Sequence, residues 1–505
     1  MVSLSRSQQV CTPDVSRLAA WPASEWRSFG RRLRQIGLNR RNLHSLAEVA
    51  PGQLPRLAHP IQSWLLAQKR KPFADAARLL LFMDRITRKE AVAAFGEDLL
   101  EKLLDIGLLV AGSGGALTSP FQMSVLKGKY VLADDLRNGA DAVMSSGGTT
   151  SALVEAVYPS RKLRLALDLG CGAGAMAIVL AERAEKVIAT DINPRALVFG
   201  RINAAINGID NVEFRQGDLF APVAEEEFDL IVSQPPFIPM PEGSPPTTYL
   251  FGGPRGDELP MQLLAGVSAH LADGGRAVVL TQWPEIAGES IVRRVRGAVA
   301  SPDTDVLLVM YPPLGLGSFA IAYSAHDLRE LGEQFEIELV RWRDHFERLK
   351  IKRFRPCFNV LRRRKQQRGW TRAVYPTQGV ATEDGIDQIL RGCDLLHDGK
   401  DAILRSTLRI PQGAFITEKQ TLGNVTKPTI QMGFNDRTMG RPAEINDAML
   451  RLLKSVHRAN TVKQGIAAYA ARKRGAADIL LPQVRNALEL GLLEVRESQV
   501  SRRTK

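Results

Sequence analysis

Two periods of hydrophobic and polar positions alternate along the chain. Between residues 143 and 327, apolar runs of strand length alternate with helical stretches. Seven such runs can be counted: LRLALDLG, AEKVIATD, NVEFRQGD, FDLIVSQPP, GRAVVLTQ, DVLLVMY and FAIAYSA. This order is typical of an α/β fold with a Rossmann-like, mostly parallel sheet. The last two runs lie too close for a crossover helix, so we expect them to form an antiparallel terminal hairpin at the sheet edge.

The uncharged run 306–325 is long enough to span a bilayer, but prolines and glycines interrupt its middle. These breakers are Pro312, Pro313, Gly315 and Gly317. Two strands joined by a turn explain the run better than a membrane helix, so we expect no membrane partner.

The segments on both sides of the sheet follow the helical period. Residues 1–70 predict a helical N-terminal segment, and residues 71–142 predict three short helices followed by Gly-rich strands, an order that suggests a winged-helix-like domain. Its third helix, around residues 97–105, is mostly acidic. A structural or substrate-gating role is therefore favoured over sequence-specific DNA reading. Residues 375–505 predict a mainly helical C-terminal domain. Its last helical stretch ends in Gly-Leu-Leu, as the one near residue 105 does, which suggests a second winged-helix-like domain.

The length and composition of the chain indicate the class of protein. With 505 residues, 45% hydrophobic and 24% charged, the chain predicts several globular domains. The four cysteines contain no CxxC pair, so neither a disulfide framework nor a zinc or other metal site is expected. The first residues lack the apolar core of a signal peptide, which favours the cytoplasm.

The net charge of +13 favours an acidic partner, and most of the excess falls in one segment. Residues 341–372 hold thirteen Lys or Arg against two acids, interleaved with five aromatic residues: Trp342, Phe346, Phe354, Phe358 and Trp370. Within the segment 328–374, this pattern predicts either a nucleic-acid-binding surface or a β-hairpin whose charges face water. The sequence leaves both alternatives open.

Three strand ends carry the candidate cofactor chemistry. The first strand ends in Asp168 and continues into a turn with Gly170, Gly172 and Gly174, whose GxGxG spacing after an acid indicates S-adenosylmethionine rather than a dinucleotide. The next strand ends at Asp191, where a carboxylate can accept hydrogen bonds from two ribose hydroxyls. The following one leads to a third acid, Asp218, which is suitably placed to accept from the adenine amine. Each acid alone could instead cap a helix, and Asp191 followed by Asn193 and Pro194 fits such a cap.

The fourth strand ends in the predicted catalytic residues Gln234, Pro235, Pro236 and Phe237. The prolines fix the backbone and leave carbonyls free to accept from a donor, and Phe237 offers a stacking surface for a planar group. Gln234 lies beside the expected cofactor and is predicted to bind it as well.

On these motifs, residues of about 144–325 resemble the methyltransferase small-domain superfamily of class I S-adenosylmethionine-dependent methyltransferases. That superfamily includes RNA guanine and adenine methyltransferases and release-factor glutamine methyltransferases. Its signature is Asn-Pro-Pro followed by an aromatic residue, so this chain departs from it at Gln234. The resemblance implies a methyltransferase domain over residues 143–327, a target amine held by the carbonyls of Gln234 and Pro235, and Thr150 near the carboxylate end of the cofactor.

Three functions follow as hypotheses. The first is N-methylation of a planar amide or amine in RNA or in a translation-related protein. The second is methylation of a peptide or small-molecule natural product gripped by the terminal domains. The third is an inactive binding scaffold, which the three strand-end acids argue against.

Overall fold

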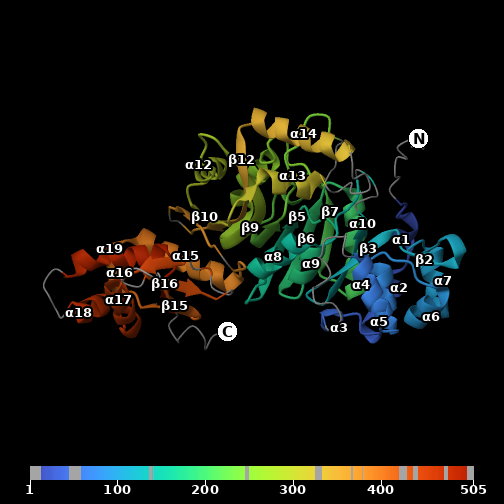
Figure 1. The fold of residues 1–505 in the computed structure, drawn as a ribbon, viewed down its shortest axis with the longest axis horizontal. Coiled ribbons are helices and arrows are strands. Elements are labelled where there is room, and N and C mark those ends of the chain that lie inside the picture. The colour runs from blue at the N-terminus through green and yellow to red at the C-terminus, as the bar shows by residue number, and fades with distance from the viewer. Residues whose placement is uncertain are drawn as a thin grey trace, which may run out of the picture.

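A computed structural model describes residues 13–44, 59–135, 139, 141–244, 249–324, 333–365, 368–377, 379–419, 429–435, 439, 442–470 and 476–496. The molecule is elongated, with an N-terminal helical module at one end, a large sheet with its helices in the middle and a C-terminal unit at the other end (Figure 1).

The central sheet has the strand order β13-β10-β12-β9-β8-β5-β6-β7, and the short β11 pairs with β12. Strands β5 to β10 are mutually parallel where they pair, and β12 alone runs antiparallel between β9 and β10. The strands are β5 Leu163–Leu169, β6 Ala184–Asp191, β7 Val212–Gln216, β8 Phe228–Ser233, β9 Leu271–Ile286, β10 Thr304–Met310, β11 Leu314–Gly315, β12 Ile351–Arg363 and β13 Thr371–Val374. The α/β class and the Rossmann-like sheet are confirmed.

Helices cover both faces of this sheet. One face packs on α8 to α10 and the other on α11 and α12, each over its own apolar core. The helices are α8 Gly148–Val157, α9 Ala175–Leu180, α10 Pro194–Asn207, α11 Glu258–Val267 and α12 Ile291–Ala298. Short 3₁₀ turns, η4 Ala221–Val223 and η5 Ser268–His270, lie in the connections.

The predicted terminal hairpin is wrong. Residues 319–325 were expected as the last strand, but Leu316–Ser324 is helix α13, and β10 pairs with the distant β12 instead. An apolar run of this length does not distinguish a strand from a buried helix turn. The ring of Phe319 is fully buried and stacks on Phe354 of β12 at 3.6 Å between centroids, so packing on the later strand stabilises the helix.

The predicted solvated hairpin at residues 328–374 is also wrong. Helix α14, Glu333–Arg348, is followed by β12, an internal strand of the sheet. All five aromatic side chains interleaved with the basic residues are buried, so none is available to stack on a base. Several of the cations are paired: Arg353 and Arg355 with Glu285, and Arg362 and Arg364 with Asp305.

We expect Asp305→Ala to cost about 3–5 kcal/mol of unfolding free energy, because it would remove one of the two carboxylates of a largely buried cluster and leave Arg362 and Arg364 with Asp394 alone. The Asp305 carboxylate is fully buried and accepts from Arg362 Nε at 2.9 Å, Arg364 Nε at 3.0 Å and the Trp370 amide at 3.0 Å. The neighbouring Asp303, whose side chain is 39% exposed, provides the matched control, since Asp303→Ala should change the free energy by less than about 1 kcal/mol. Urea unfolding of both variants measures the difference, and equal losses would contradict this role for Asp305.

The N-terminal module consists of helices, a small antiparallel pair and a hairpin. Helices α5, α6 and α7 lead into β1 and β2, and Ile86 adds a bridge to Leu117. The winged-helix-like assignment of residues 71–142 stays a prediction. The elements are α1 Ser16–Ala20, α2 Ala23–Gln35, α3 Arg40–His44, α4 His59–Ala67, α5 Pro72–Leu80, α6 Arg88–Phe95, α7 Glu97–Asp105, β1 Val110–Ala111, η2 Ser113–Gly115, β2 Leu117–Thr118, β3 Phe121–Leu126 and β4 Lys129–Asp134.

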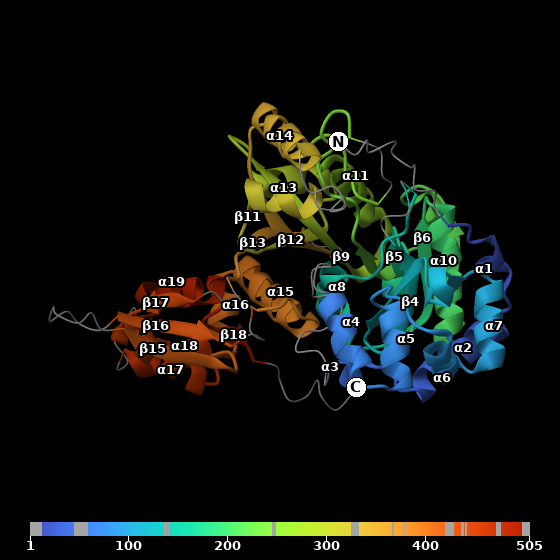
Figure 2. The ribbon, with the colours of Figure 1, turned by 45° about the vertical axis from the view of Figure 1, so that its right-hand side comes forward.

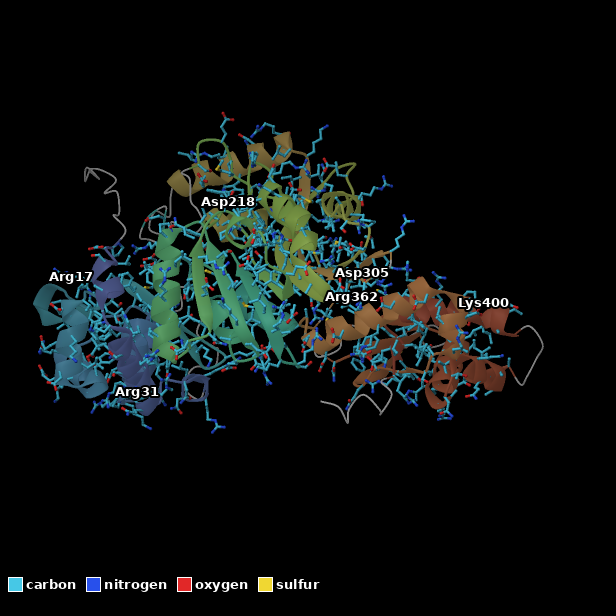
Figure 3. The ribbon with its side chains drawn as sticks, turned by 180° about the vertical axis from the view of Figure 1, so that it is seen from behind. Arg17, Arg31, Asp218, Asp305, Arg362 and Lys400 are labelled. Carbon is cyan, nitrogen blue, oxygen red and sulfur yellow. The ribbon has the colours of Figure 1, made fainter. Side chains whose placement is uncertain are left out.

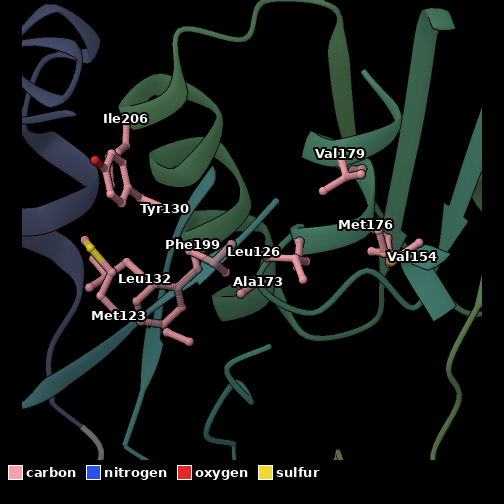
Figure 4. Packing of buried hydrophobic residues seen from close by; sticks show 14 of the residues in the cluster. Met123, Leu126, Tyr130, Leu132, Val154, Ala173, Met176, Val179, Phe199 and Ile206 are labelled. Carbon is pink, nitrogen blue, oxygen red and sulfur yellow. The ribbon is translucent and has the colours of Figure 1, made fainter. Parts of the chain in front are cut away.

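The hairpin β3–β4 docks this module on α10. The buried side-chain amide of Asn203 accepts from the backbone N–H of Leu132 at 2.7 Å and donates to the Leu132 carbonyl at 2.8 Å. The side chain of Asn207 likewise accepts from the backbone N–H of Tyr130 and donates to its carbonyl. Beside these bonds, Tyr130, Leu132 and Phe199 lie in one apolar cluster (Figure 4). The strand edge is thus satisfied by side-chain amides instead of another strand.

The C-terminal unit contains more strand than predicted. Its helices enclose an apolar core against the three-stranded antiparallel sheet β15-β16-β17, which the prediction of a mainly helical domain did not include. Salt bridges from Arg276 to Glu383 and Asp387 join α15 to the central sheet. The elements are α15 Glu383–Asp398, α16 Lys400–Arg405, β14 Leu408–Arg409, β15 Ala414–Lys419, β16 Thr429–Phe434, β17 Ala443–Ile445, α17 Asp447–Arg458, α18 Val462–Tyr469, α19 Ala476–Glu489 and β18 Glu494–Val495.

Within the described ranges, no helix combines the length and apolar character that crossing a bilayer requires. The same part of the chain holds no group of three or more His, Cys, Asp or Glu side chains placed to bind a metal ion.

Candidate active site

The carboxyl ends of the parallel strands bring the predicted site residues to one edge of the sheet. Asp168 lies near the end of β5, Asp191 ends β6, and Gln234 follows β8 directly. Asp218 follows β7, and its exposed side chain lies at this edge of the molecule (Figure 3). In open α/β sheets, ligands bind in the crevice outside these strand ends.

The glycine turn after β5 has two different functions. All three glycines have positive φ, +70° at Gly170, +52° at Gly172 and +76° at Gly174. A Cβ at Gly170 or Gly172 would meet no atom within 4 Å, whereas one at Gly174 would lie 3.1 Å from the Gly200 Cα. The first two therefore leave open space beside the backbone, and the third permits close packing of the turn on α10.

Asp191 is held in place by the backbone. Its Oδ2 accepts from the Gly172 amide at 2.8 Å and its Oδ1 from the Asn193 amide at 2.9 Å, and burial raises the pKa of the carboxyl. The side chain that caps α10 is Asn193, which accepts from the Arg195 amide. The alternative in which Asp191 is the helix cap is therefore wrong.

Asp168 is nearly fully buried. Its Oδ2 accepts from the Ala177 amide at 2.8 Å, near the start of α9. Burial raises the pKa of Asp168 to about 7, and the nearby Asp191 charge adds to the rise. A carboxyl in this state gains most from a positively charged ligand, because such a ligand stabilises its ionised form.

Gln234 is oriented by a residue that sequence reasoning missed. Its Nε2 donates to the Thr149 hydroxyl at 2.9 Å, which leaves the amide oxygen free to accept from another group. Thr149 lies in the first turn of α8 beside Thr150, which is half-buried. The Thr-Thr pair in the sequence did not indicate which of the two would contact the motif.

The chain after Gln234 is packed against a second glycine turn. A Cβ at Gly252 would lie 2.6 Å from the Pro236 carbonyl oxygen, and one at Gly256 would lie 2.6 Å from the Phe237 carbonyl oxygen. The Gly252 amide donates to the Ile238 carbonyl at 2.9 Å. Only glycine permits this approach, so the turn fixes the backbone of the motif.

Phe237 points into an apolar cluster formed with α13 and α14, together called the cap. Its side chain is only 8% exposed and packs with residues that include Phe319, Trp342 and Phe346. Figure 2 shows α13 and α14 together over one side of the central sheet. The stacking of Phe237 on a substrate stays a prediction.

The cap is also joined to the second glycine turn by hydrogen bonds that the sequence did not reveal. His345 of α14 donates from Nε2 to the Pro254 carbonyl at 2.7 Å, and Arg348 donates to its Nδ1 at 3.0 Å. Burial lowers the pKa of His345, in accord with a neutral ring that donates and accepts at once.

Comparison with known proteins identifies this region. Residues 143–245 match the family described as the methyltransferase small domain. These residues are similar to methyltransferase small domains. The matched range includes the first glycine turn, the strand-end acids and the Gln-Pro-Pro-Phe motif.

The same part of the chain is similar to curated proteins over part of their length. A release factor glutamine methyltransferase of Xylella fastidiosa is 36% identical over 148 residues, which cover 27% of this chain and 54% of that protein. One from Deinococcus radiodurans is 38% identical over 119 residues, covering 22% and 42%. The chain thus spans about half the length of these relatives.

Among solved structures, an rRNA methylase from Streptococcus thermophilus aligns at 15% identity with a TM-score of 0.26. The alignment covers 43% of this chain and 95% of that one.

Proposed function

We propose that this protein transfers a methyl group from S-adenosylmethionine to the side-chain amide nitrogen of a glutamine in a translation-related protein of the cytoplasm. The single observation that carries the proposal is the juxtaposition, at one sheet edge, of the half-buried Asp191 bonded to the first glycine turn and the Gln234 amide oriented by Thr149. The names of the similar proteins support the substrate class.

The donor fits the residues present. The open space beside Gly170 and Gly172 suits a ligand that runs close to the backbone, and Asp191 would hold its ribose hydroxyls. Asp218 would accept from the adenine amine, while Asp168 and Thr150 would face the amino-acid end. When bound, S-adenosylmethionine supplies an electrophilic methyl group on a sulfonium ion.

The chain's own residues would position the acceptor amide. A glutamine nitrogen is a poor nucleophile because its lone pair is shared with the carbonyl. The Gln234 side-chain oxygen and the Pro235 carbonyl would accept its two N–H groups, which favours the geometry in which that lone pair points at the methyl group. The carbonyls also favour loss of the proton that must leave after transfer.

A protein acceptor fits this structure better than RNA near the methyl-transfer site. The aromatic residues of the basic segment are buried, and many of its arginines are paired with carboxylates. Base stacking, on which recognition of single-stranded RNA relies, would lack aromatic partners there.

Labelled S-adenosylmethionine incubated with cell extract and purified protein tests the proposal. We expect label in the protein fraction that protease releases and RNase does not, and expect methylglutamine after enzymatic digestion. A synthetic acceptor peptide with Gln replaced by Asn is the matched control. Label that RNase releases, or that remains in a low-mass fraction after both enzymes, would contradict the proposal.

The pKa of Asp168 predicts a pH dependence of cofactor binding. Since burial raises that pKa to about 7, the carboxyl is largely protonated at pH 6 and ionised at pH 8. A cationic ligand that needs the carboxylate should therefore bind about tenfold more tightly at pH 8 than at pH 6. Isothermal titration of S-adenosylmethionine measures this, and Asp168→Asn should flatten the profile; an equally steep profile in that variant would assign the titration elsewhere.

The raised pKa of Asp168 also makes the stability of the unliganded protein depend on pH, but in the opposite direction from cofactor binding. A raised pKa means that the folded state binds the proton more tightly than the unfolded state. The free energy of unfolding should accordingly fall as pH rises from about 4 through 7, and Asp168→Asn should remove that part of the dependence.

A further inference from the structure

One group of basic residues lies apart from the methyl-transfer site, on the C-terminal unit. Helix α17 presents Arg451, Lys454 and Arg458 at spacings of three and four residues, which place them on one side of the helix. All three side chains are exposed.

Two further exposed cations lie where the end of α16 meets the start of α18. The Val462 amide at the start of α18 donates to the Ser406 carbonyl at 2.9 Å, so the end of α16 lies against the start of α18. Arg405 and Lys463, the neighbours of these two residues, are both exposed. We name the five cations the α17 basic face: Arg405, Arg451, Lys454, Arg458 and Lys463.

The α17 basic face differs from the segment 341–372, in which many cations have carboxylate partners. In the part of the chain that the structure describes, none of its five side chains forms an ion pair or a hydrogen bond. By contrast, two other described cations of the unit have carboxylate partners: Arg409 pairs with Glu494, and Lys400 pairs with Asp478.

His457 of α17 lies close to several positive charges. Its Nδ1 accepts from the Ile410 amide at 3.0 Å, and Arg496 donates to its carbonyl. Burial lowers the pKa of His457, and the positive charges of Arg496, Arg458 and Arg409 lower it further. Arg458 of α17 is therefore one of the positive charges close to His457.

The composition of the face indicates the chemistry of its partner. The exposed large apolar residues of this end of the chain, Val380, Phe415, Ile416 and Ile479, all lie outside α17 and α18. A protein interface needs an apolar core, whereas an interface with nucleic acid is more polar and much more positive. Helix α17 has no Phe, Tyr or Trp, so it lacks the stacking platform typical of single-strand binding. The features together fit the phosphates of a duplex.

We propose that the α17 basic face binds the phosphate backbone of double-stranded RNA and so brings the methyltransferase domain to an RNA-containing assembly. The choice of RNA over DNA rests on the proposed function, in which the acceptor is a translation-related protein. The contact itself depends only on the unpaired cations.

Fluorescence anisotropy with the full chain and a labelled RNA duplex of about 20 base pairs tests the proposed RNA binding. The measurement contains neither cofactor nor acceptor, so its result does not depend on methyl transfer. The test variant is Arg451→Gln/Lys454→Gln/Arg458→Gln. The matched control is Arg31→Gln/Arg34→Gln/Arg41→Gln, which removes three exposed cations from α2 and α3. Arg31 lies on the N-terminal module, at the opposite end of the molecule from Lys400 of α16 (Figure 3).

We expect the α17 variant to bind at least about tenfold more weakly at about 0.1 M salt, with the slope of log K against log salt reduced by about 2–3. The control should stay within about twofold of wild type, and thermal unfolding of both variants should match wild type.

Equal losses in the two variants would overturn the assignment and point to net charge alone. DNA of the same sequence bound as tightly as the RNA would overturn the choice of RNA. Binding of polyglutamate, but not of RNA, through the same residues would indicate an acidic protein as the partner instead.

Discussion

Asp191→Ala should abolish binding of S-adenosylmethionine in a titration that detects the wild-type interaction. The variant removes both a bidentate acceptor for ribose hydroxyls and the carboxylate oxygen that holds the Gly172 amide at 2.8 Å. Two charge-assisted hydrogen bonds at about 1.5–3 kcal/mol each correspond to at least a hundredfold loss of affinity. The glycine turn would lose its anchor as well.

Asp191→Asn and Asp229→Ala separate binding from folding. The Asn variant keeps one acceptor oxygen and should retain weak binding. Asp229 accepts from the Arg164 amide at 2.7 Å, at the opposite end of β5 from Asp168. Its loss therefore affects the same sheet, but away from the cofactor site. Wild-type affinity in Asp191→Ala would remove the structural basis for the cofactor assignment.

Gln234→Ala should lower kcat by about 10²–10³ while changing cofactor affinity by less than about threefold. The Gln234 oxygen would accept from the acceptor amide as its nitrogen is attacked, and loss of one such preorganised group has that order of effect. A methyl-transfer assay on the acceptor protein, run with both substrates varied, measures the two quantities separately.

Thr149→Val tests whether orientation of Gln234 contributes. Without the hydroxyl that accepts from Gln234 Nε2, the amide can rotate, so we expect a smaller decrease in kcat of about tenfold. Thr149→Ser keeps the hydroxyl and should behave like wild type. If Gln234→Ala and wild type have equal kcat, the amide does not act on the acceptor.

The parallel half of the fold was predictable because each strand ends in a recognisable chemical signal. Asp168, the glycine turn and Asp191 follow apolar runs at positions that only a shared sheet edge explains. The roles of the individual glycines were not predictable, because the reason for Gly174 is its 3.1 Å approach to Gly200 on a helix further along the chain.

The position of β12 in the sheet could not be predicted, because its local sequence pattern points to a different environment. Strand β12 carries Arg353, Arg355 and Arg362, and Arg364 follows its end, so the sequence resembles a solvated strand. These arginines reach carboxylates from β9, β10 and α15, partners that lie far apart in sequence. Local patterns also missed Thr149 and His345, because each contacts the site through a single hydrogen bond across a long sequence separation.

The position of β12 between β9 and β10 also determines the order in which the protein can assemble as it leaves the ribosome. Strand β10 finds no neighbour in the sheet until the cap and then β12 have been synthesised, so a nascent chain ending before Ile351 leaves the edges of β9 and β10 unpaired. A fragment cut at the limits of the matched region, residues 143–245, would lack four strands of the main sheet order, β9, β10, β12 and β13, and should aggregate. The smallest piece that completes the sheet must extend to Val374.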